Sequence, residues 1–525
     1  AATFLIGLAF AARQVSSSVS VIPTRPNVIF VLSDDQGIGE VSITPGRTNL
    51  EIQTPHIDAL LRSGMMFTNG YATPVCAPSR TALLTSKHLG HASIRGNLVG
   101  NGTDLALPAD EITFLQVLQQ NQYKISCIGK WGVGNVGNIG APWLKGCDSF
   151  MGVLGQGGAH SMYPTTNIVA YDPVSGPTYL DFPENAGATR ERCMAEDNNC
   201  TWTQKLFTDA TVAELEAHTA RQGRQRAAAR NAAAAGGAAN STTAAVGSGG
   251  VEPFFLLLCL TTPHAGHWAA KQPSGFPVSA DGRFVDEEWP DVEKDHASVI
   301  ENHLDYSVGR IIRRLEKLGL TESTAVFFTS DNGATNEGDG HSAAFFGSSG
   351  PLTGYKRFVN EGGIRVPLGV SWPGVIPVGT VDVPVAIWDC GPTILAMAGV
   401  PRVEWPPGID GPAAVAAQAT AAALPAVYEH PPLYWEFCTT YRPSDVKRQG
   451  AGWSRAVRDG RWKALWFFKE GVDSAPRLYD LDADVAETDD VAAAHPDVVA
   501  RLTAFADAAH VDNAYFPAVD NCQPS

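Results

Sequence analysis

The sequence lacks the features that mark several classes of protein. No cluster of basic residues accompanies the formal net charge of −16, and nucleic-acid binding needs such clusters. Nine cysteines in 525 residues are too few for a disulfide scaffold. No apolar run is long enough to cross a bilayer, since residues 4–12 stop at Arg13 and the next best run covers only 254–260. With 44% apolar residues, the chain is predicted to fold around a large core, without a transmembrane segment or a nucleic-acid partner.

The first residues and three tripeptides favour an exported protein. Residues 4–12 are typical of the apolar part of a secretory signal, so we assign 1–25 to a signal-peptide remnant outside the fold; a frayed apolar terminus is the alternative. Glycosylation tripeptides begin at Asn101, Asn199 and Asn240, although such tripeptides also arise by chance. We therefore expect a glycoprotein of the secretory pathway that is extracellular, lysosome-like or periplasmic.

The cysteines divide by their surroundings. Cys193 and Cys200 lie in a polar segment and could be bridged, whereas Cys127 and Cys259 lie in strand-like apolar runs and are predicted to be buried thiols. Cys76 fits neither group, because it lies in the polar stretch T-P-V-C-A-P-S-R. Its position needs a chemical explanation.

Four short apolar runs are predicted to be buried parallel strands, and each is followed directly by polar residues. The runs are 28–32, 125–128, 254–260 and 325–329, and they precede S-D-D-Q-G, G-K-W, T-T-P-H and S-D-N-G. In open α/β sheets, ligands bind beyond the carboxyl ends of the strands. The four polar clusters are therefore expected to meet at one site.

Helices and a second sheet are predicted elsewhere. Residues 297–318 carry an apolar stripe at helical spacing that ends at Gly319. Residues 219–251 have no apolar periodicity and are predicted to be a surface insertion or a flexible loop. Alternating residues around the D-G pair at 459–460 predict an antiparallel hairpin over 453–467.

These patterns predict an α/β protein in two parts. The main domain spans 26–375, includes the insertion at 219–251, and has a mostly parallel central sheet flanked by helices. A smaller C-terminal α+β subdomain with an antiparallel sheet spans 376–525.

Two pairs of oxygen-bearing side chains predict a metal site. Asp34 and Asp35 follow the first strand, and Asp331 and Asn332 follow the last. Adjacent carboxylates repel one another unless a cation neutralises them, and hard oxygen ligands suit Ca²⁺ or Mg²⁺ better than zinc. A single pair could simply open a turn or cap a helix, but two pairs at two strand ends favour a metal.

Cys76 is predicted to lie next to a helix that begins near Pro78, with Arg80 and Lys87 on the same helical face. The helix N-terminus and Arg80 favour an anion close to Cys76, which suits either a reactive thiolate or a bound oxyanion. A thiolate is, however, a poor partner for a metal held by oxygen ligands. An unmodified cysteine therefore fits this site badly.

The stretch C-A-P-S-R-T-A-L-L-T-S-K at 76–87 does not stand alone. It is accompanied by P-N-V-I-F-V-L-S-D-D-Q-G, G-K-W, F-F-T-S-D-N-G and G-Y-K-R-F-V-N-E-G-G-I-R-V-P. Together these segments resemble the type I sulfatases of the alkaline phosphatase superfamily, from about Pro26 to Phe505. Arylsulfatase A and N-acetylgalactosamine-6-sulfatase relatives are the nearest in character.

The resemblance implies an alkaline-phosphatase-like fold and a sulfuric ester hydrolase that cleaves carbohydrate or aryl sulfates. In this family a formylglycine-generating enzyme oxidises the signature cysteine to formylglycine, whose hydrated aldehyde is an oxygen nucleophile. Carried over residue by residue, the resemblance implies that one Ca²⁺ is held by Asp34, Asp35, Asp331, Asn332 and the modified Cys76.

The other implied site residues surround the sulfate. Arg80 would steady the diol, Lys130 and Lys356 would contact sulfate oxygens, and His264 would protonate the leaving oxygen. A tetrahedral dianion needs several cations directed at its oxygens. Lys87 matches a basic position of the signature and would lie behind these residues.

One position departs from the family pattern. Histidine is common where this chain has Gly132, and the downstream segment Q-G-G-A-H-S-M-Y-P offers His160 as the replacement imidazole. A hydrogen-bonded structural histidine is the alternative for His160. His341 is expected either at the substrate rim or in a solvated loop.

Two further functions stay open at this point. Phosphomonoester and phosphonate ester hydrolases share the scaffold. The glycine at position 132 also leaves room for an inactive protein that binds sulfated glycans.

Overall fold

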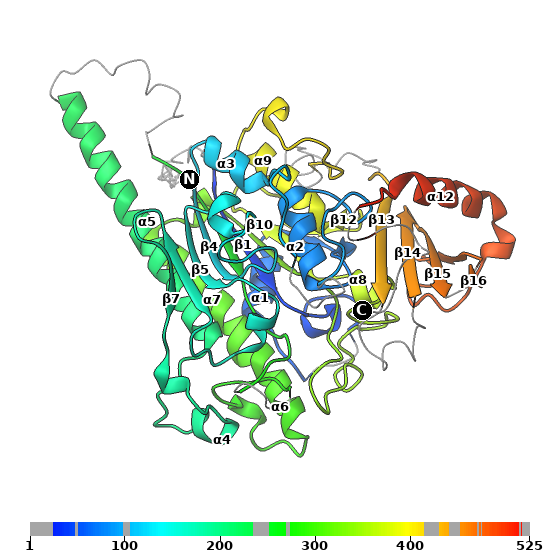
Figure 1. Ribbon diagram of the computed structural model, residues 1–525, viewed down its shortest axis with the longest axis horizontal. Coiled ribbons are helices and arrows are strands. Elements are labelled where there is room, and N and C mark those ends of the chain that lie inside the picture. Colours follow the sequence, from blue (N-terminus) through cyan, green and yellow to red (C-terminus); the bar gives the residue numbers. More distant parts are fainter. Residues whose placement is uncertain are drawn as a thin grey trace, which may run out of the picture.

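A mixed sheet of ten strands forms the centre of the computed structural model (Figure 1). The structure describes residues 25–47, 51–97, 105–234, 251–268, 274–413, 430–439, 452–469, 472–473, 475–513 and 516. The strand order is β11-β2-β10-β9-β1-β8-β4-β5-β6-β7. The strands are β1 (Asn27–Ser33), β2 (Met65–Phe67), β4 (Lys124–Lys130), β5 (Ser149–Val153), β6 (Ile168–Asp172), β7 (Gly176–Leu180), β8 (Phe254–Cys259), β9 (Thr324–Ser330), β10 (Leu368–Ser371) and β11 (Gly379–Val381).

Five central strands run parallel to one another, in the order β9, β1, β8, β4 and β5. All four predicted strands lie in this parallel core, so the sequence prediction is confirmed. Antiparallel partners flank it, with β10 beside β9 on one side and β6 and β7 beyond β5 on the other. The sheet is therefore mixed, with a parallel centre.

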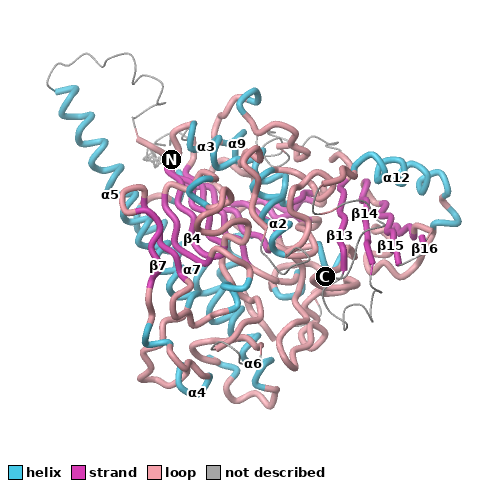
Figure 2. The backbone as a smooth tube through the Cα atoms, viewed as in Figure 1, coloured by secondary structure: helices cyan, strands magenta, loops and turns pink. Residues whose placement is uncertain are grey.

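Both faces of the sheet are buried, which explains why its central strands are continuous apolar runs. Along β1, Ile29 and Val31 face one core cluster, and Val28, Phe30 and Leu32 face the other. Helices α1 (Pro55–Arg62), α5 (Thr203–Ala234) and α7 (Tyr306–Leu318) cover the first face; α2 (Cys76–Thr85), α3 (Phe114–Gln120) and α9 (Cys390–Met397) cover the second. The molecule thus has three layers, as Figures 1 and 2 show.

The predicted helix over 297–318 is confirmed, with an earlier start. Helix α6 (Asp291–Ser298) continues through a π-helical turn at Val299–Asp305 into α7. Gly319 ends it in the left-handed conformation, with φ 66°, as a glycine cap allows. Two further helices are short, α4 (Arg190–Cys193) before α5 and α8 (Glu361–Ile364) before β10.

The flexible-loop alternative for 219–251 is wrong for residues 219–234, which continue the 32-residue helix α5. Alanine, arginine and glutamine are strong helix formers, so this stretch needs no apolar stripe to be helical. Figure 1 shows the end of α5 projecting beyond the body of the molecule. Residues 235–250 lie outside the described residues.

A second sheet follows near the C-terminus and is antiparallel throughout. It comprises β13 (Leu433–Thr439), β14 (Gly452–Asp459), β15 (Trp462–Lys469), β16 (Val472–Asp473) and β17 (Arg477–Asp480), and α12 (Pro496–Ala509) packs on it. The predicted hairpin is β14–β15. A two-stranded sheet of β3 (Gly70–Tyr71) and β12 (Val385–Ala386) lies apart from both. The domain boundaries 26–375 and 376–525 stay a prediction.

The cysteine predictions had mixed outcomes. Cys193 and Cys200 form a disulfide as predicted, and Cys259 is a buried free thiol. Cys127 is not a free thiol, because it is bonded to Cys147. Cys147 lies just before β5, which pairs with β4, and a single sequence does not reveal which strand lies beside β4.

The predicted signal remnant at 4–12 and the tripeptides at Asn101 and Asn240 lie outside the described residues. Asn199 is exposed. Among the described helices, none combines the length and the apolar character needed to span a bilayer.

Candidate active site

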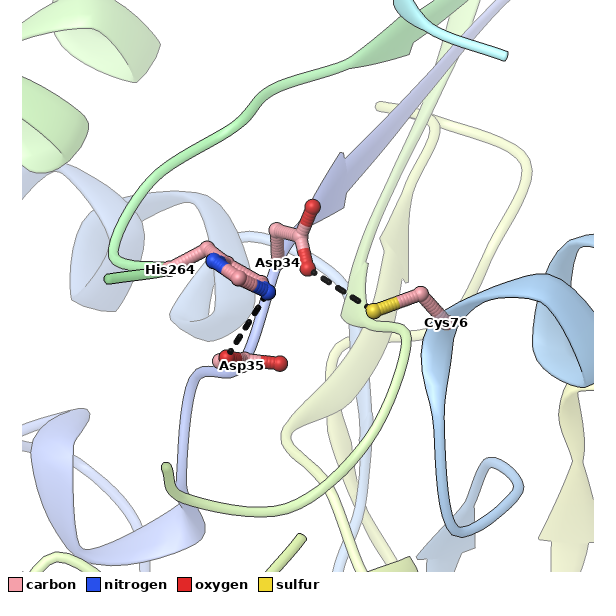
Figure 3. Close-up of side chains that lie close together, drawn as sticks. All are labelled: Asp34, Asp35, Cys76 and His264. Carbon is pink, nitrogen blue, oxygen red and sulfur yellow. Dashed lines mark hydrogen bonds and ion pairs between the residues drawn. The ribbon is translucent and has the colours of Figure 1, made fainter. Parts of the chain in front are cut away.

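The four polar clusters meet at the carboxyl edge of the parallel strands, as predicted. Asp34 and Asp35 follow β1, and Lys130 is the last residue of β4. His264 lies beyond β8, and Asp331 directly follows β9. Figure 3 shows Asp34 directed toward Cys76 and Asp35 directed toward His264.

Cys76 is the first residue of α2 and is fully buried. The helix therefore starts two residues earlier than predicted. The Cys76 Sγ lies 3.4 Å from Asp34 Oδ1. Burial, together with the nearby carboxylates of Asp331 and Asp34, raises the pKa of the Cys76 thiol. A reactive thiolate is therefore disfavoured here, and a plain cysteine would remain a weak nucleophile.

The buried site holds three carboxylates and three cations that pair with one another: Asp34, Asp35, Asp331, Arg80, Lys130 and Lys356. Arg80 Nη2 lies 2.8 Å from Asp331 Oδ2 and 3.3 Å from Asp34 Oδ2. Lys130 Nζ lies 2.7 Å from Asp34 Oδ2. Buried ions are costly unless they are paired, and these pairs meet that requirement.

The carboxylates are crowded even with these partners. Burial and the charge of Asp34 raise the pKa of Asp331 to about 7, although Arg80 opposes this. Asp35 adopts the left-handed conformation, with φ 70°, which costs a non-glycine residue about 1 kcal/mol. Such strain is retained where a side chain must be held in a set direction.

His264 and Lys356 form a pair on the far side of Asp35. Lys356 Nζ lies 2.8 Å from Asp35 Oδ2 and 2.9 Å from His264 Nε2. His264 Nδ1 donates to the carbonyl oxygen of Ala265 at 2.5 Å, so its Nε2 carries the lone pair. Burial lowers the pKa of His264, and the imidazole is therefore neutral.

Part of the donor set suits a hard divalent cation. Ligand atoms of Asp34, Asp35, Cys76 and His264 all lie within 4.8 Å of one another. The two carboxylates are hard donors, whereas the thiol and the imidazole are softer. Asn332 Nδ2 donates to Asp35 Oδ1 at 2.8 Å, whereas its Oδ1 is buried without a hydrogen-bond partner among the described residues. A buried acceptor with no donor is expensive, and an oxygen-binding cation at this point would satisfy it.

A side chain at Gly132 would need its neighbours to move. Its φ is 80°, and a Cβ would lie 2.5 Å from Gln156 Nε2 and 3.0 Å from Arg80 Cδ. Gln156 Nε2 instead donates to the Gly132 carbonyl oxygen at 3.1 Å. His160 is close by, with its ring edge-on to His264 at 4.6 Å between centroids, and burial lowers its pKa.

Two expectations about basic residues are wrong. Lys87 does not share a helical face with Cys76 and Arg80, because α2 ends at Thr85 and Ser86 turns the chain with φ 59°. Lys87 instead pairs with Glu111 at 2.6 Å, and its place behind the sulfate-binding residues stays a prediction. His341 is neither at a rim nor in solvent, since its side chain is buried against Glu293 Oε2 at 2.8 Å.

Glu337 was missed by the sequence analysis. Its Oε2 lies 3.1 Å from Lys356 Nζ, and its Oε1 lies 2.6 Å from Arg357 Nη2. The available signal was an acidic residue in the polar run that follows Asp331 and Asn332. Polar runs often hold acidic residues in solvated loops, so this signal is weak.

Comparisons with known proteins place the chain in a family. The sulfatase family model matches residues 26–223 and 238–400. A second model, described as the C-terminal part of N-sulphoglucosamine sulphohydrolase, matches 354–505. The chain belongs to the sulfatase family, and the resemblance noted in the sequence is confirmed.

Curated relatives agree with this assignment. The chain is 29% identical over 397 residues to mouse N-acetylgalactosamine-6-sulfatase, with 72% of this chain and 63% of the relative covered. It is 29% identical over 419 residues to mouse steryl-sulfatase, with 72% and 62% covered. The chain thus spans slightly less than two thirds of the length of these two relatives.

Solved structures share the fold. Ps i-CgsB superposes with a TM-score of 0.66 at 23% identity, covering 92% of both chains. The phosphonate monoester hydrolase of Silicibacter pomeroyi superposes with a TM-score of 0.55 at 19% identity, covering 92% of this chain and 94% of that chain. At this level of identity the likeness concerns the fold alone.

Proposed function

We propose that this chain hydrolyses sulfate monoesters of carbohydrates or aryl alcohols. The observation that carries the proposal is the convergence of Cys76, at the start of α2, with carboxylates and buried cations at one edge of the sheet. Membership of the sulfatase family and the names of the two mouse relatives support it.

The proposal includes a modified residue and one Ca²⁺. A maturation enzyme would convert Cys76 to formylglycine, whose hydrated form supplies an oxygen nucleophile in place of the disfavoured thiolate. Asp34, Asp35, Asp331 and Asn332 would hold the ion, which supplies positive charge where the sulfate oxygens lie. The raised pKa of the Cys76 thiol and the unpaired Asn332 Oδ1 support both parts.

The cations of the site would bind and orient the sulfate. Arg80 would steady residue 76, since it is fixed by Asp331 and by the Lys130 carbonyl oxygen. Asp34 holds Lys130, and Asp35 holds Lys356. Two ammonium groups held in this way would stabilise the charge that develops on a tetrahedral sulfate.

His264 would manage the proton of the leaving alcohol. Its Nε2 accepts from Lys356 in this structure, so the imidazole must take up a proton at Nε2 before it can protonate the leaving oxygen. His160 would supply the second imidazole at this edge, since Gly132 offers none. Its ring packs edge-on against His264.

The test is a side-by-side assay of an aryl sulfate and an aryl phosphate with the matured protein. We expect sulfate turnover that is lost after chelator treatment and restored by Ca²⁺. Cys76→Ala should abolish turnover, and its thermal unfolding should stay close to that of the parent, because the change removes one sulfur atom from the helix start.

Other outcomes would contradict the proposal in different ways. Phosphate turnover alone would favour the phosphomonoester or phosphonate ester alternative, for which the shared fold of the Silicibacter hydrolase is the supporting observation. Binding of sulfated sugars without turnover, in protein that carries formylglycine, would favour an inactive binding protein. A panel of sulfated monosaccharides would then narrow the substrate.

We also propose that the chain matures in the secretory pathway or periplasm. The disulfides Cys127–Cys147 and Cys193–Cys200 support an oxidising compartment. The exposed Asn199 is compatible with glycosylation. Comparing the mass of the secreted protein before and after glycosidase treatment tests whether it is glycosylated.

A further inference from the structure

Glu337 holds two consecutive cations at the edge of the site. Its two carboxylate oxygens contact Lys356 Nζ at 3.1 Å and Arg357 Nη2 at 2.6 Å. The charges of Lys356 and Arg357 outweigh the cost of burial and lower the pKa of Glu337, which is therefore ionised. Glu337 is 12% exposed, so the contacts are shielded from solvent.

The backbone is bent to make this arrangement possible. Neighbouring side chains of an extended segment point to opposite sides, yet Lys356 and Arg357 reach the same carboxylate. Arg357 adopts φ 78°, a left-handed conformation that costs about 1 kcal/mol for a residue of this type. Backbone bonds from Lys356 to Ala334 and from Arg357 to Pro74 hold the bend in place.

Lys356 also competes for a carboxylate of the metal site. All three of its N–H donors are used, by Asp35, His264 and Glu337. A cation that binds Asp35 must displace the ammonium group from that carboxylate or tolerate its repulsion. In the described structure the other two site cations, Arg80 and Lys130, have carboxylate partners only among Asp34 and Asp331, which are proposed ligands themselves.

We propose that Glu337 is a positioning residue that retains Lys356 when Asp35 turns to the metal, and so strengthens metal binding from outside the ligand set. The inference rests on the proposed metal site. It concerns the chain's own electrostatics and does not depend on turnover. Without Glu337, Asp35 would be the only charged partner of the Lys356 ammonium among the described residues, and the ammonium would oppose the ion.

The test is calorimetric titration of chelator-treated protein with Ca²⁺. We expect Glu337→Gln to weaken Ca²⁺ affinity about tenfold, the size of effect typical of directly coupled charged groups. Lys356→Ala should instead strengthen Ca²⁺ binding. In the Lys356→Ala background, Glu337→Gln should change affinity only about twofold, because the group through which it acts is gone.

The matched control is Glu293→Gln, which neutralises another buried glutamate. The Glu293 carboxylate contacts His341 and the backbone of Ser342 instead of the site, so Ca²⁺ affinity should not change. Thermal unfolding without metal checks that each variant is folded. If Glu337→Gln is unfolded, Glu337→Asp replaces it, since the shorter side chain keeps the charge but loses reach and should weaken binding by a smaller factor.

The possible contradictions are distinct. Unchanged affinity in a folded Glu337→Gln or Glu337→Asp variant overturns the inference and leaves the proposed function intact. An equal loss in both backgrounds also overturns it, because Glu337 would then attract the ion through space without Lys356. A parent protein that binds no Ca²⁺ overturns both this inference and the metal part of the proposed function.

Discussion

Gly132 illustrates at the residue scale how the site tolerates a departure from the family pattern. Its backbone is in the left-handed region, and the space in front of it is filled by Gln156 and the Arg80 stem. A histidine here would carry the strain of a positive φ and would have to displace the Gln156 amide and the Arg80 stem. His160, the last residue of a short 3-10 helix, packs against His264 and stays the predicted replacement imidazole.

Gly132→Ala is expected to reduce both stability and sulfate turnover. The added Cβ would displace Gln156 or Arg80, and the positive φ adds about 1 kcal/mol of strain. Gly137→Ala is the control, because Gly137 has φ 87° but a Cβ added there would have no neighbouring atom within 4 Å. Equal effects of the two changes on kcat, measured alongside chemical unfolding, would contradict a steric role for position 132.

At this scale the sequence predicted the residues of the site better than their contacts. Asp34, Asp331 and Lys130 were predicted from motifs at strand ends and Arg80 from the signature at the helix start, and the structure brings them together. The contact of Glu337 with Lys356 was not predicted, because it joins two loops with no shared motif. Their roles in catalysis stay a prediction.

Helix α2 is anchored at its first turn, at the scale of one element. The Ser79 hydroxyl donates to the Asp331 carbonyl oxygen, and it accepts from the backbone N–H of Thr73 at 2.9 Å. This links the helix that carries Cys76 to the loop that carries a proposed metal ligand. A small hydroxyl group in the signature thus has a structural reason that does not involve maturation.

Ser79→Ala should lower the free energy of unfolding by about 1–2 kcal/mol, because two buried backbone groups lose their partner. It should also weaken Ca²⁺ affinity, since Asp331 becomes less fixed. Thr81→Val is the matched control on the same helix, because the Thr81 hydroxyl is buried without a hydrogen-bond partner. Denaturant unfolding and calcium titration measure both effects on protein that need not be matured.

The elements themselves divide by the kind of signal they carry. The central strands were predicted because both faces are buried and their runs are continuously apolar. Helix α5 was missed, because its outer half depends on intrinsic propensity and shows no periodic pattern, and no helix was predicted over its inner half. The antiparallel strands β6 and β7 were not predicted, because they lie at the sheet edge, where half-exposed residues dilute the pattern.

At the scale of the whole molecule, buried charges join the C-terminal sheet to helix α8. Lys463 of β15 lies 2.8 Å from both Glu361 of α8 and Glu487, and all three are buried. The Trp435 indole donates to the carbonyl oxygen of Ala72, which follows β3, at 2.8 Å. The C-terminal sheet is therefore bound to α8 and to the segment after β3 by specific polar contacts, in addition to apolar packing.

Lys463→Met should lower the free energy of unfolding by about 3–5 kcal/mol, the usual cost of breaking a buried ion pair, because Glu487 loses its lysine partner while Glu361 keeps Arg365 at 3.2 Å. Adding Glu487→Gln should recover part of that loss, because the carboxylate left without its lysine is then neutral. Denaturant unfolding of the single and double variants decides this. A single variant as stable as the parent would mean that the cluster does not join the C-terminal sheet to α8.

His88 makes the same region sensitive to acid. Burial lowers the pKa of His88 to about 4, although Asp410 opposes this and His91 adds to it. The Gly90 N–H points at His88 Nδ1 at 3.1 Å, so protonation would put two donors face to face. The ring also packs against Tyr434 of the C-terminal sheet.

The lowered pKa of His88 sets the direction in which stability changes with pH. The folded state binds this proton less readily than the unfolded state, so stability is full above pH 6.5 and is lost as the pH falls toward 4. The loss from this residue should reach about 3 kcal/mol. We expect His88→Gln to show a smaller drop in unfolding free energy between about pH 7 and pH 4, and an unchanged pH profile would refute the assignment.

The central claim is that residue 76 reacts as an oxygen nucleophile made from cysteine. Its most direct measurement is the mass of the peptide that contains Cys76, taken on preparations with different extents of maturation and compared with their rates of aryl sulfate hydrolysis. The account predicts that the rate rises in proportion to the fraction of peptide in which formylglycine has replaced the thiol. Full activity in protein whose Cys76 peptide retains its sulfur would contradict it.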